Sequence, residues 1–311
     1  MQTIIKDFCQ GIDLHQSRVV NGPLKITVFG GPTSNSNGAQ LSQRGMFLVS
    51  PQALSTPEGS FIVPEDYKNW NHFGTYDDLL SFEEDVCSLV DGVIVFLETE
   101  GAIAELGCLL KNEQVAHKLY VVVSNEHYQN DSFIKLGPLR FLENTYSNSN
   151  VHVWHGGQLT FNDFGMILDQ VKDRIGERPK IESFQIENTR HVLFLIVDFV
   201  DLLQVARITD IQAFLTALSI SFHKKRLEQL LLSLKNIGLL REERVHSERC
   251  FVVDAEDRPA IDYHFTSSTS KRVSWKAKAF GKTIDDKWRK YAFHSLKQTA
   301  DSSGGDKKDA A

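Results

Sequence analysis

The chain has 311 residues, 41% of them hydrophobic and 24% charged, which is typical of a globular protein with about two domains. A net charge of −6 excludes a protein that binds nucleic acid over its whole surface, but it allows a local basic patch. The four cysteines are far apart and form no CxxC pair, which favours reduced, buried thiols in a cytoplasmic protein over zinc or disulfide sites.

Strands alternate with helices from residue 24 to about residue 176. Residues 1–23, which lack the layout of a signal peptide, form an N-terminal extension. Apolar runs predict strands at 24–29, 60–63, 92–97, 118–124 and 151–154, and helical spacing predicts helices at 39–48, 76–89, 102–114 and 162–174. Such alternation is typical of a parallel sheet with helices on both faces. We therefore expect an α/β domain at 24–176, with a doubly wound parallel sheet of the flavodoxin or Rossmann type.

The pattern changes after the breaker-rich stretch 176–180. Two short apolar runs follow three predicted helices, which lie at 190–206, 209–219 and 223–236. The first of these helices is the most apolar segment, but Asp198 and Asp201 interrupt it, so we expect a core helix and no membrane span. Three helices and a hairpin are the outline of a winged helix-turn-helix, which we assign to 185–265. A basic and aromatic segment, 266–299, and a disordered tail, 300–311, complete the expected organisation.

A carboxylate, Glu105, lies between Gly101 and Gly107 in the helix expected after the strand at 92–97. That strand is apolar on both faces, as central parallel strands are, and open α/β sheets bind ligands at the carboxyl ends of such strands. Gly101 would let the chain turn sharply and let a ligand approach the backbone, and the helix N-terminus favours an anion there. An ionised Glu105 would attack an anomeric carbon and begin a retaining displacement. The spacing alone favours a simpler interpretation, a helix-start charge that only complements the dipole.

The loops after the first two strands carry further candidates. The first strand ends at Phe29 and continues into Gly30 and Gly31, whose N–H groups would cradle phosphate or ribose; the alternative is a plain tight turn. This loop is neither a G-x-G-x-x-G nor a Walker A loop, so we predict no nucleotide cofactor. Glu65 and Asp66 follow the second strand, where they would bind ribose hydroxyls or belong to a solvated loop.

Residues farther along the chain are candidates for the same site. Glu83 flanks an otherwise apolar helix face and would reach the site as a second carboxylate, or take part in a surface pair. Arg140 would bind phosphate with both arms of its guanidinium, or be an ordinary exposed arginine. His152 and His155 have metal-ligand spacing only on a helix, and the strand expected there favours packed or hydrogen-bonded histidines, so we predict no metal site.

The run VDGVIVFLETEGAIAELG resembles the signature of the nucleoside 2-deoxyribosyltransferases, in which a nucleophilic glutamate lies between two glycines after a strand. It is most similar to a group within that superfamily, the deoxyribosyltransferase-like effectors encoded beside retron reverse transcriptases. The similarity extends in consistent order over about 24–142, through ITVF before the glycine pair, VPED, LSFE, NE followed by KL, SFI and GPLR. The resemblance implies that Glu105 is a nucleophile and that the chain is a toxic N-glycosidase effector.

The sequence departs from the family pattern at two positions of the motif. Transferases that act on free nucleosides carry an aspartate two residues before the motif glycine, where this chain has Thr99 between Glu98 and Glu100. Ala102 replaces the usual threonine or serine. The retron effectors depart in a similar way, which favours an altered substrate over an inactive site. We therefore predict Glu105 and Glu83 as catalytic residues and a substrate-binding set made of Phe29, Gly30, Gly31, Asp66, Thr99, Gly101, Ala102 and Arg140.

Basic residues in the C-terminal half predict contacts with nucleic acid or with a protein partner. The third helix of the winged part begins with Lys224, Lys225 and Arg226 and would enter a major groove, although charged helix faces are usually only solvated. Segment 271–291 carries eight lysines and arginines against two aspartates, interleaved with four aromatic residues, a mixture that suits phosphate pairing and base stacking. In this segment we predict contacts for Lys271, Arg272, Trp275 and Lys276.

The resemblance implies a cytoplasmic effector of a bacterial retron anti-phage defence system of the toxin–antitoxin type. It would be restrained by the reverse transcriptase and its multicopy single-stranded DNA (msDNA), and it would form a homo-oligomer or larger assembly, because sites of this kind are often built at subunit interfaces. The expected reaction is cleavage of the N-glycosidic bond of a nucleotide. NAD is the first choice, because nicotinamide is a good, already cationic leaving group, and a deoxynucleotide is the second. Two alternatives stay open: a nucleotide-binding sensor without turnover, and a DNA-binding regulator driven by the winged helix.

Overall fold

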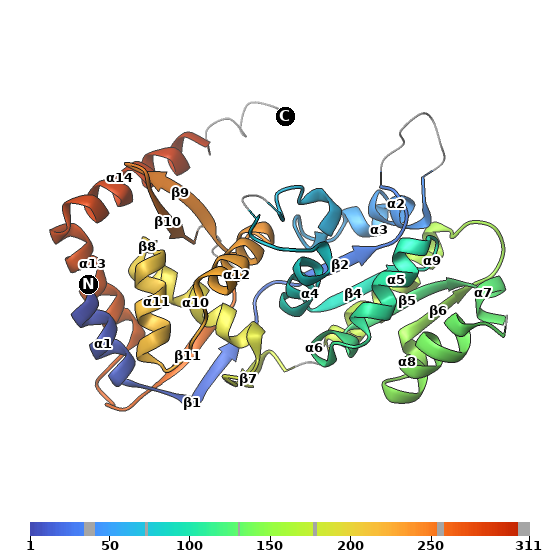
Figure 1. Cartoon of the computed structure of the whole chain (residues 1–311), viewed down its shortest axis with the longest axis horizontal. Coiled ribbons are helices and arrows are strands. Elements are labelled where there is room, and N and C mark those ends of the chain that lie inside the picture. The colour runs from blue at the N-terminus through green and yellow to red at the C-terminus, as the bar shows by residue number, and fades with distance from the viewer. Residues whose placement is uncertain (34–40, 72–73, 130, 177–178, 254–257, 304–311) are drawn as a thin grey trace. The chain divides into compact units, whose positions relative to one another are not determined.

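The structure, a computed structural model, describes residues 1–33, 41–71, 74–129, 131–176, 179–253 and 258–303, with 296–303 as backbone only. The described residues belong to two compact units (Figure 1). One unit is Pro23–Pro179, and the other combines Met1–Gly22 with the residues from Lys180 onward. The N-terminal segment therefore belongs to the same unit as the C-terminal half of the chain.

The unit Pro23–Pro179 is built on a five-stranded parallel sheet (Figure 1). Its strands, in spatial order, are β3 (Phe61–Ile62), β2 (Ile26–Phe29), β4 (Gly92–Phe96), β5 (Leu119–Ser124) and β6 (Val151–Trp154). The predicted α/β class and parallel sheet are thus confirmed. After β3 the chain crosses to the other side of β2, so the strand order reverses between β2 and β4. Open α/β sheets place their ligands at the carboxyl ends of two such strands.

Helices cover both faces of this sheet. On one face, α2 (Gln43–Leu48) and α9 (Phe161–Gly176) pack in a common core with Phe96 of β4. The neighbouring residue Val95 points to the opposite face, by the two-residue period of a strand, and is also fully buried. α4 (Leu79–Leu89) and α5 (Glu100–Leu109) cover that second face.

Helix caps explain where the observed helices differ from the predicted ones. The predicted helix 102–114 is divided, because the side chain of Asn112 accepts the N–H of Gln114 and begins a new helix, α6. α4 begins three residues later than predicted because Asp78 caps it, and α2 begins after the cap Ser42. The predicted start of α2, at 39–40, lies outside the described residues. The shorter elements of this unit are α3 (Pro51–Leu54), η1 (Pro64–Asp66), α6 (Glu113–Ala116), α7 (Asn125–Gln129), η3 (Lys135–Leu139), α8 (Arg140–Thr145) and η4 (Asn148–Asn150).

An antiparallel sheet in the second unit joins the two halves of the chain. Its strands, in spatial order, are β11 (Ala260–Phe265), β1 (Ile12–Val20) and β7 (Ile181–Ser183). α1 (Gln2–Gln10) precedes β1 and buries Phe8 against the rings of Tyr263 and Trp275. None of these elements was predicted from the sequence.

The three helices and the hairpin predicted for the second half are present. They are α10 (Thr189–Leu203), α11 (Ile208–Ala217), α12 (Lys224–Asn236), and the strands β9 (Arg241–Val245) and β10 (Glu248–Val252), which form a sheet with β8 (Ala206–Arg207). Two further helices, α13 (Arg272–Asp285) and α14 (Lys287–Ser303), follow β11. α14 includes the first residues of the segment expected to be a disordered tail, and residues 304–311 lie outside the described part of the chain.

Two sequence expectations concern the interior, one about the most apolar helix and one about the thiols. Among the described residues, no helix combines the length and apolar character of a membrane span, and α10 is almost entirely buried. Cys9, Cys87 and Cys250 are free and buried, whereas Cys108 is partly exposed, contrary to expectation. Burial raises the pKa of Cys9 to about 12 and that of Cys250 to about 11, so both are neutral thiols at neutral pH.

Candidate active site

Glu105 and Glu83 come from neighbouring helices on one face of the parallel sheet. α5 begins directly after β4 because the hydroxyl of Thr99 accepts the N–H of Ala102 at 3.1 Å and caps the helix. Glu105 therefore lies in the second turn of α5, and its side chain is partly buried. Glu83 lies among the buried residues of α4, and only 4% of its surface is exposed.

The charges of neighbouring carboxylates raise the pKa of both carboxyl groups. Burial, together with the negative charges of Glu105 and Glu65, raises the pKa of Glu83 to about 8. Burial and the charge of Glu65 raise the pKa of Glu105 to about 7, against the opposing effect of Arg44. Glu83 Oε1 and Glu105 Oε2 are buried without a hydrogen-bond partner among the described residues. Because buried polar atoms nearly always have partners, this pair indicates a place for the donors of a ligand or for a shared proton.

An ion pair between Arg44 and Glu65 completes the charged cluster. Arg44 Nη1 lies 2.5 Å from Glu65 Oε1, and the two side chains are 4% and 38% exposed. Sequence reasoning missed Arg44, because an arginine at the start of a short helix carries no signal that it is buried. It weighed Glu65 beside Asp66 and selected Asp66, but Glu65 is the residue of η1 that pairs with Arg44.

Gly30 and Gly31 leave room for Arg44 and Glu98. A Cβ on Gly30 would lie 2.9 Å from both the Cβ of Arg44 and Oε1 of Glu98, and the φ of +152° also disfavours a side chain. A Cβ on Gly31 would lie 2.6 Å from the Cβ of Ser42. The N–H of Gly31, predicted to cradle phosphate or ribose, donates instead to Oε1 of Glu98 at 2.8 Å. The glycine pair therefore serves the close packing of this loop against α2.

Glu98 ties the loop after β2 to the turn after β4. Its carboxylate accepts the backbone N–H groups of Gly31 at 2.8 Å, Gln43 at 2.7 Å and Arg44 at 3.1 Å. Two of these donors belong to the first turn of α2, where backbone N–H groups have no partner inside the helix. Glu98, another residue that sequence reasoning did not select, thus holds α2 and Arg44 beside the start of α5.

The predicted binding residues at the start of α5 have different environments. The hydroxyl of Thr99 is occupied as the helix cap, and Ala102 is 1% exposed, so its methyl group packs in the core. The sharp turn expected at Gly101 is not present, because this residue lies inside α5 and its φ is not positive. A Cβ at Gly101 would meet only the Thr99 hydroxyl, at 3.8 Å, so the backbone there is open to approach.

Three other predicted binding residues form no hydrogen bond or ion pair with Glu65, Glu83 or Glu105 among the described residues. Phe29 is fully buried at the end of β2 and packs in the core. Asp66 ends η1 and Arg140 begins α8, and both side chains are exposed. In the described part of the chain, neither Asp66 nor Arg140 forms an ion pair.

An apolar cavity of about 420 Å³ lies beside α2, but the carboxylate cluster does not line it. The cavity touches Met46 and Val49, which lie on a different face of α2 from Arg44 because of the 3.6-residue period of a helix. The rest of its wall comes from the loop before α9 and the start of that helix: Gln158, Leu159, Thr160, Phe161 and Phe164.

Three of the predicted contact residues of α13 are engaged inside the second unit. Arg272 Nη2 lies 2.6 Å from Asp201 Oδ2 and 3.0 Å from Asp198 Oδ1. Lys276 Nζ lies 3.0 Å from Asp201 Oδ2, and Trp275 is only 9% exposed. These side chains therefore attach α13 to α10 and to the core of the unit.

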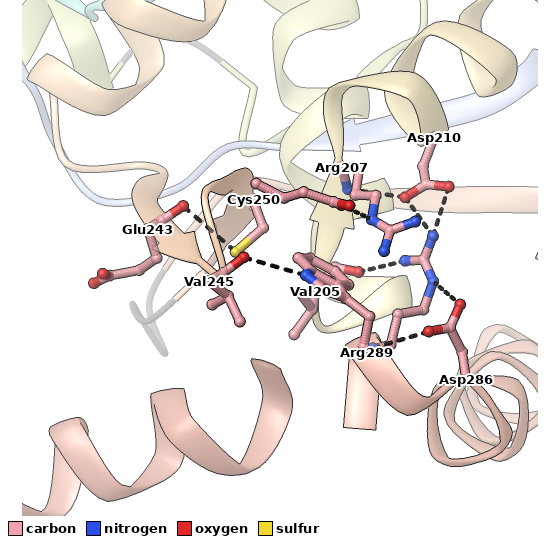
Figure 2. A network of polar contacts seen from close by, with 10 residues as sticks. Val205, Arg207, Asp210, Glu243, Val245, Cys250, Asp286 and Arg289 are labelled. Atoms are coloured by element: carbon pink, nitrogen blue, oxygen red, sulfur yellow. Dashed lines mark hydrogen bonds and ion pairs between the residues drawn. The ribbon is translucent and has the colours of Figure 1, made fainter. Parts of the chain in front are cut away.

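Arg289 anchors α14 in a similar way (Figure 2). Its Nη2 donates to both carboxylate oxygens of Asp210, at 2.8 and 2.7 Å, and its Nη1 donates to the carbonyl of Val205 at 2.9 Å. Both charged side chains are 3% exposed. Trp288 adds a hydrogen bond from Nε1 to the carbonyl of Val245 at 3.2 Å, so α14 is attached to α11 and to the hairpin.

The remaining lysines of the basic segment are exposed. We call them the outer lysines: Lys271, Lys278, Lys282, Lys287 and Lys290. Two aromatic residues of the same helices, Phe280 and Tyr291, are 38% and 52% exposed. Because Arg272, Lys276 and Arg289 pair with acidic residues of α10 and α11, the excess positive charge of this segment is carried by the outer lysines. Among them, Lys282 lies 3.5 Å from Asp285 in an exposed ion pair.

The start of α12 is exposed, but its middle is neutralised. Lys224 and Lys225 are exposed, and Arg226 is partly exposed with Nη1 3.5 Å from Gln229 Oε1. Farther along, an alternating chain of ion pairs connects α12 to β9 and β10, through Glu228, Arg249, Glu242 and Lys235. Arg249 and Arg241 of the hairpin therefore have acidic partners within the unit.

His152 lies in β6 and His155 follows it. Burial lowers the pKa of His152, against the opposing effects of Asp163 and of a hydrogen bond with Gln170. His155 lies after the strand and is exposed. Over the ranges that the structure describes, no group of three or more histidine, cysteine, aspartate and glutamate side chains is placed to hold a metal ion.

Comparison with known proteins relates this site to a family. The chain is similar to two Escherichia coli proteins. "Retron Ec86 putative ribosyltransferase/DNA-binding protein" is 33% identical over 131 residues, which is 40% of this chain and 40% of that protein. "Retron Ec73 putative ribosyltransferase/DNA-binding protein" is 34% identical over 64 residues, 21% of this chain and 20% of that protein. The matches thus span less than half the length of either relative. The family model of the STM3845 retron effector protein matches residues 40–242, more than half of the chain, which therefore belongs to this retron effector family.

Proposed function

We propose that this retron effector is an N-glycosidase in which Glu105 is the nucleophile and Glu83 the acid–base group. The proposal is carried by two carboxyl groups beside the carboxyl ends of β2 and β4, buried Glu83 and partly buried Glu105, each with a raised pKa and an unpartnered oxygen. The names of the two Escherichia coli relatives include a ribosyltransferase, which is an activity at the anomeric carbon of a sugar. That is the carbon at which an N-glycosidase acts.

In the first step, a carboxylate oxygen of Glu105 attacks the anomeric carbon of the substrate. A C–O bond forms while the C–N bond to the base breaks through an oxocarbenium-like state, and the base leaves with the electron pair. A neutral base takes a proton from Glu83 as it leaves, whereas a cationic base such as nicotinamide needs none. In the second step, water attacks the same carbon and Glu105 is released. The proton of the water passes to Glu83 if that group has donated its own, and otherwise to solvent.

The protonation states required by this reaction agree with the electrostatics of the site. Glu105 must be ionised to attack, and Glu83 must be protonated to donate. The pKa of Glu105 is raised to about 7 and that of Glu83 to about 8, so this combination is populated near neutral pH. Two carboxyl groups with different environments can thus take different roles.

The substrate we propose is a nucleotide, with NAD first and a deoxynucleotide second. Nicotinamide is already cationic in NAD, so its departure needs little acid catalysis. Three carboxyl groups lie in this site: Glu65 acts on both Glu83 and Glu105, and Glu105 acts on Glu83. An acidic environment of this kind stabilises a developing oxocarbenium ion and accepts hydrogen bonds from sugar hydroxyls.

We further propose roles for the two units. The strand order β3-β2-β4-β5-β6 supports a doubly wound sheet of the flavodoxin type. The succession of α10, α11, α12 and the β9–β10 hairpin supports a winged helix-turn-helix. This second unit would dock onto the retron reverse transcriptase and its msDNA and restrain toxicity, with the outer lysines as the contact surface. We also propose that the chain forms a homo-oligomer or a larger assembly.

A nucleotide sensor without turnover is the second candidate function. The unpartnered oxygens of Glu83 and Glu105 would equally accept hydrogen bonds from ribose hydroxyls. The two candidates differ in one respect, since a sensor binds its nucleotide and returns it intact.

Release of free base by the purified chain tests the proposal. The chain would be incubated with NAD and with a panel of nucleosides and nucleotides, and released base would be measured by chromatography. We expect release by the wild-type chain and a loss of about a thousandfold or more in Glu105→Ala, because the nucleophile is removed. Glu100→Ala, which removes an exposed carboxylate from the first turn of the same helix, is the matched control and should keep its activity. Nucleotide binding by wild type without release of base would favour the sensor.

A further inference from the structure

Arg44 is held in one position by contacts with three parts of the chain. Its Nε donates to the carbonyl of Gly31 at 2.6 Å, and its Nη1 donates to the carbonyl of Val28 at 3.3 Å. The same Nη1 pairs with Glu65 of η1 at 2.5 Å, and the backbone N–H of Arg44 donates to Glu98 at 3.1 Å. A guanidinium with this many fixed partners has little freedom to change its rotamer.

The fold makes room for this side chain. The Cβ of Arg44 would be 2.9 Å from any Cβ added to Gly30, a distance that carbon atoms do not tolerate. Gly30 is therefore needed where the backbone of α2 at residue 44 comes close to the end of β2, an approach that brings the Arg44 guanidinium to Val28 and Glu65. Burying an arginine costs free energy unless the guanidinium has charged and hydrogen-bonding partners. A buried arginine at this edge of the sheet therefore indicates a functional role.

Several charged or titratable groups lie around Glu105, and among those described Arg44 is the cation that lowers its pKa. α4 contributes the carboxyl group of Glu83 and the neutral thiol of Cys87, and η1 contributes Glu65. Lys118, which directly precedes β5, donates to carbonyls at the end of α4 and acts on Cys87. Glu98, in the turn before α5, is a further carboxylate near Arg44 and accepts three backbone N–H groups, including that of Arg44. When Glu65, Glu83 and Glu105 are all ionised, their three negative charges act on one another and on the positive charge of Arg44.

We propose that Arg44 is a positioning residue of this site, which holds Glu65 in an ion pair and keeps Glu105 in its ionised, nucleophilic form. The inference deepens the proposed function and rests on the role assigned there to Glu105. Removal of Arg44 should raise the pKa of Glu105 in two ways. It removes the attraction that stabilises ionised Glu105, and it leaves Glu65 as an unpaired negative charge that repels it.

A double-mutant cycle with Arg44→Met and Glu65→Gln separates this role from a purely structural one. The rate of base release would be measured against pH for the wild type, both single variants and the double variant. In the wild type, the acid limb should lie near the pKa of Glu105, about 7. We expect this limb to move up by about one unit or more in Arg44→Met, which means about tenfold less activity at low pH. It should move down in Glu65→Gln and return close to the wild-type position in the double variant.

A uniform loss of activity at every pH in Arg44→Met, with no return in the double variant, would overturn the proposal, because it would mean that Arg44 only supports the fold. Thermal unfolding of each variant shows whether it is folded. If Arg44→Met does not fold, Glu65→Gln alone decides, because Glu65 is 38% exposed and its loss should be tolerated. An acid limb that Glu65→Gln leaves in place would then contradict the inference. Lys111→Met, which removes an exposed charge from the same unit, is the matched control and should leave the limb unchanged.

A carboxyl titration followed by ¹³C NMR makes the result independent of turnover. The Glu105 signal is assigned by its absence from the spectrum of Glu105→Gln. If the wild type releases no base but Arg44→Met raises the titration midpoint of Glu105, the proposed function fails and the inference on Arg44 stands. If the midpoint is the same in both chains, the inference is wrong whatever the activity.

Discussion

Glu83 is a residue whose position makes its ionised form costly. Burial is the main cause that raises its pKa from 4.5 to about 8. Between these two values the folded chain keeps a proton that the unfolded chain has released, so the free energy of unfolding falls as pH rises through this window. At pH values below both, the folded chain pays no such penalty. A carboxyl group that lowers the stability of the fold at neutral pH is typical of a residue with a role in activity.

Glu83→Gln should therefore stabilise the fold in a pH-dependent way. We expect its free energy of unfolding to exceed that of the wild type by an amount on the order of a few kcal/mol above about pH 8, and the gain to shrink toward about pH 5. Denaturant unfolding at both pH values measures the difference. Glu100→Gln is the control, because its side chain is exposed. An equal gain at both pH values would show that the carboxyl group of Glu83 is not held neutral by the fold.

At the scale of the elements, the glycine pair after β2 is a packing requirement. Gly30 has a φ of +152°, and an added Cβ would come within 3.0 Å of three atoms, from Arg44, Glu98 and Phe96. Gly30→Ala should destabilise the unit Pro23–Pro179 by about 1–3 kcal/mol and displace α2. Gly107→Ala is the matched control, because its Cβ would meet nothing within 4 Å and it lies inside α5. This control should instead gain about 0.5–1 kcal/mol. Thermal or denaturant unfolding of both variants measures the contrast, and a neutral Gly30→Ala would contradict it.

The parallel sheet could be predicted from the sequence because its strands are short, continuous apolar runs. β4 is buried at all five positions, and such a run followed by helical spacing has few other interpretations. The sheet of β1, β7 and β11 could not be predicted in this way. β1 pairs with β11 across most of the chain length, and an irregularity between Asp13 and Arg18 interrupts its alternation of apolar and polar residues.

The candidate site was predictable only in part, for a related reason. Glu105 could be selected because it follows a buried strand in a motif that resembles a family signature, and Glu83 because it is a carboxylate flanking an otherwise apolar helix face. The contributions of Arg44 and Glu98 depend on the directions of side chains in a short helix and a turn, which periodicity does not give. The segment 271–291 has a basic and aromatic composition, but composition could not show that Arg272, Trp275 and Lys276 face inward.

At the scale of the whole molecule, charge is distributed unevenly. The net charge is −6, yet segment 271–291 has eight basic residues against two acidic ones. Buried and partly buried acids of α10 and α11 neutralise three of the eight, and those three attach α13 and α14 to the rest of their unit. The five outer lysines carry the excess charge into solvent beside exposed aromatic rings, a combination that suits a single strand of nucleic acid.

Charge reversal of three outer lysines tests this surface. The triple variant Lys278→Glu, Lys282→Glu and Lys290→Glu should bind a fluorescently labelled single-stranded oligodeoxynucleotide about tenfold or more weakly, because lysine–phosphate contacts are lost. For this variant, the slope of log K against log salt concentration should be smaller in magnitude by about 2. Each lost phosphate contact removes about 0.7 from that slope for a single strand. Fluorescence anisotropy at several salt concentrations measures both quantities. The control reverses three exposed lysines elsewhere, Lys6, Lys68 and Lys111, so that it has the same net charge. Equal weakening in both variants would mean that binding follows net charge alone, whereas an effect confined to the outer lysines would identify them as the contact surface.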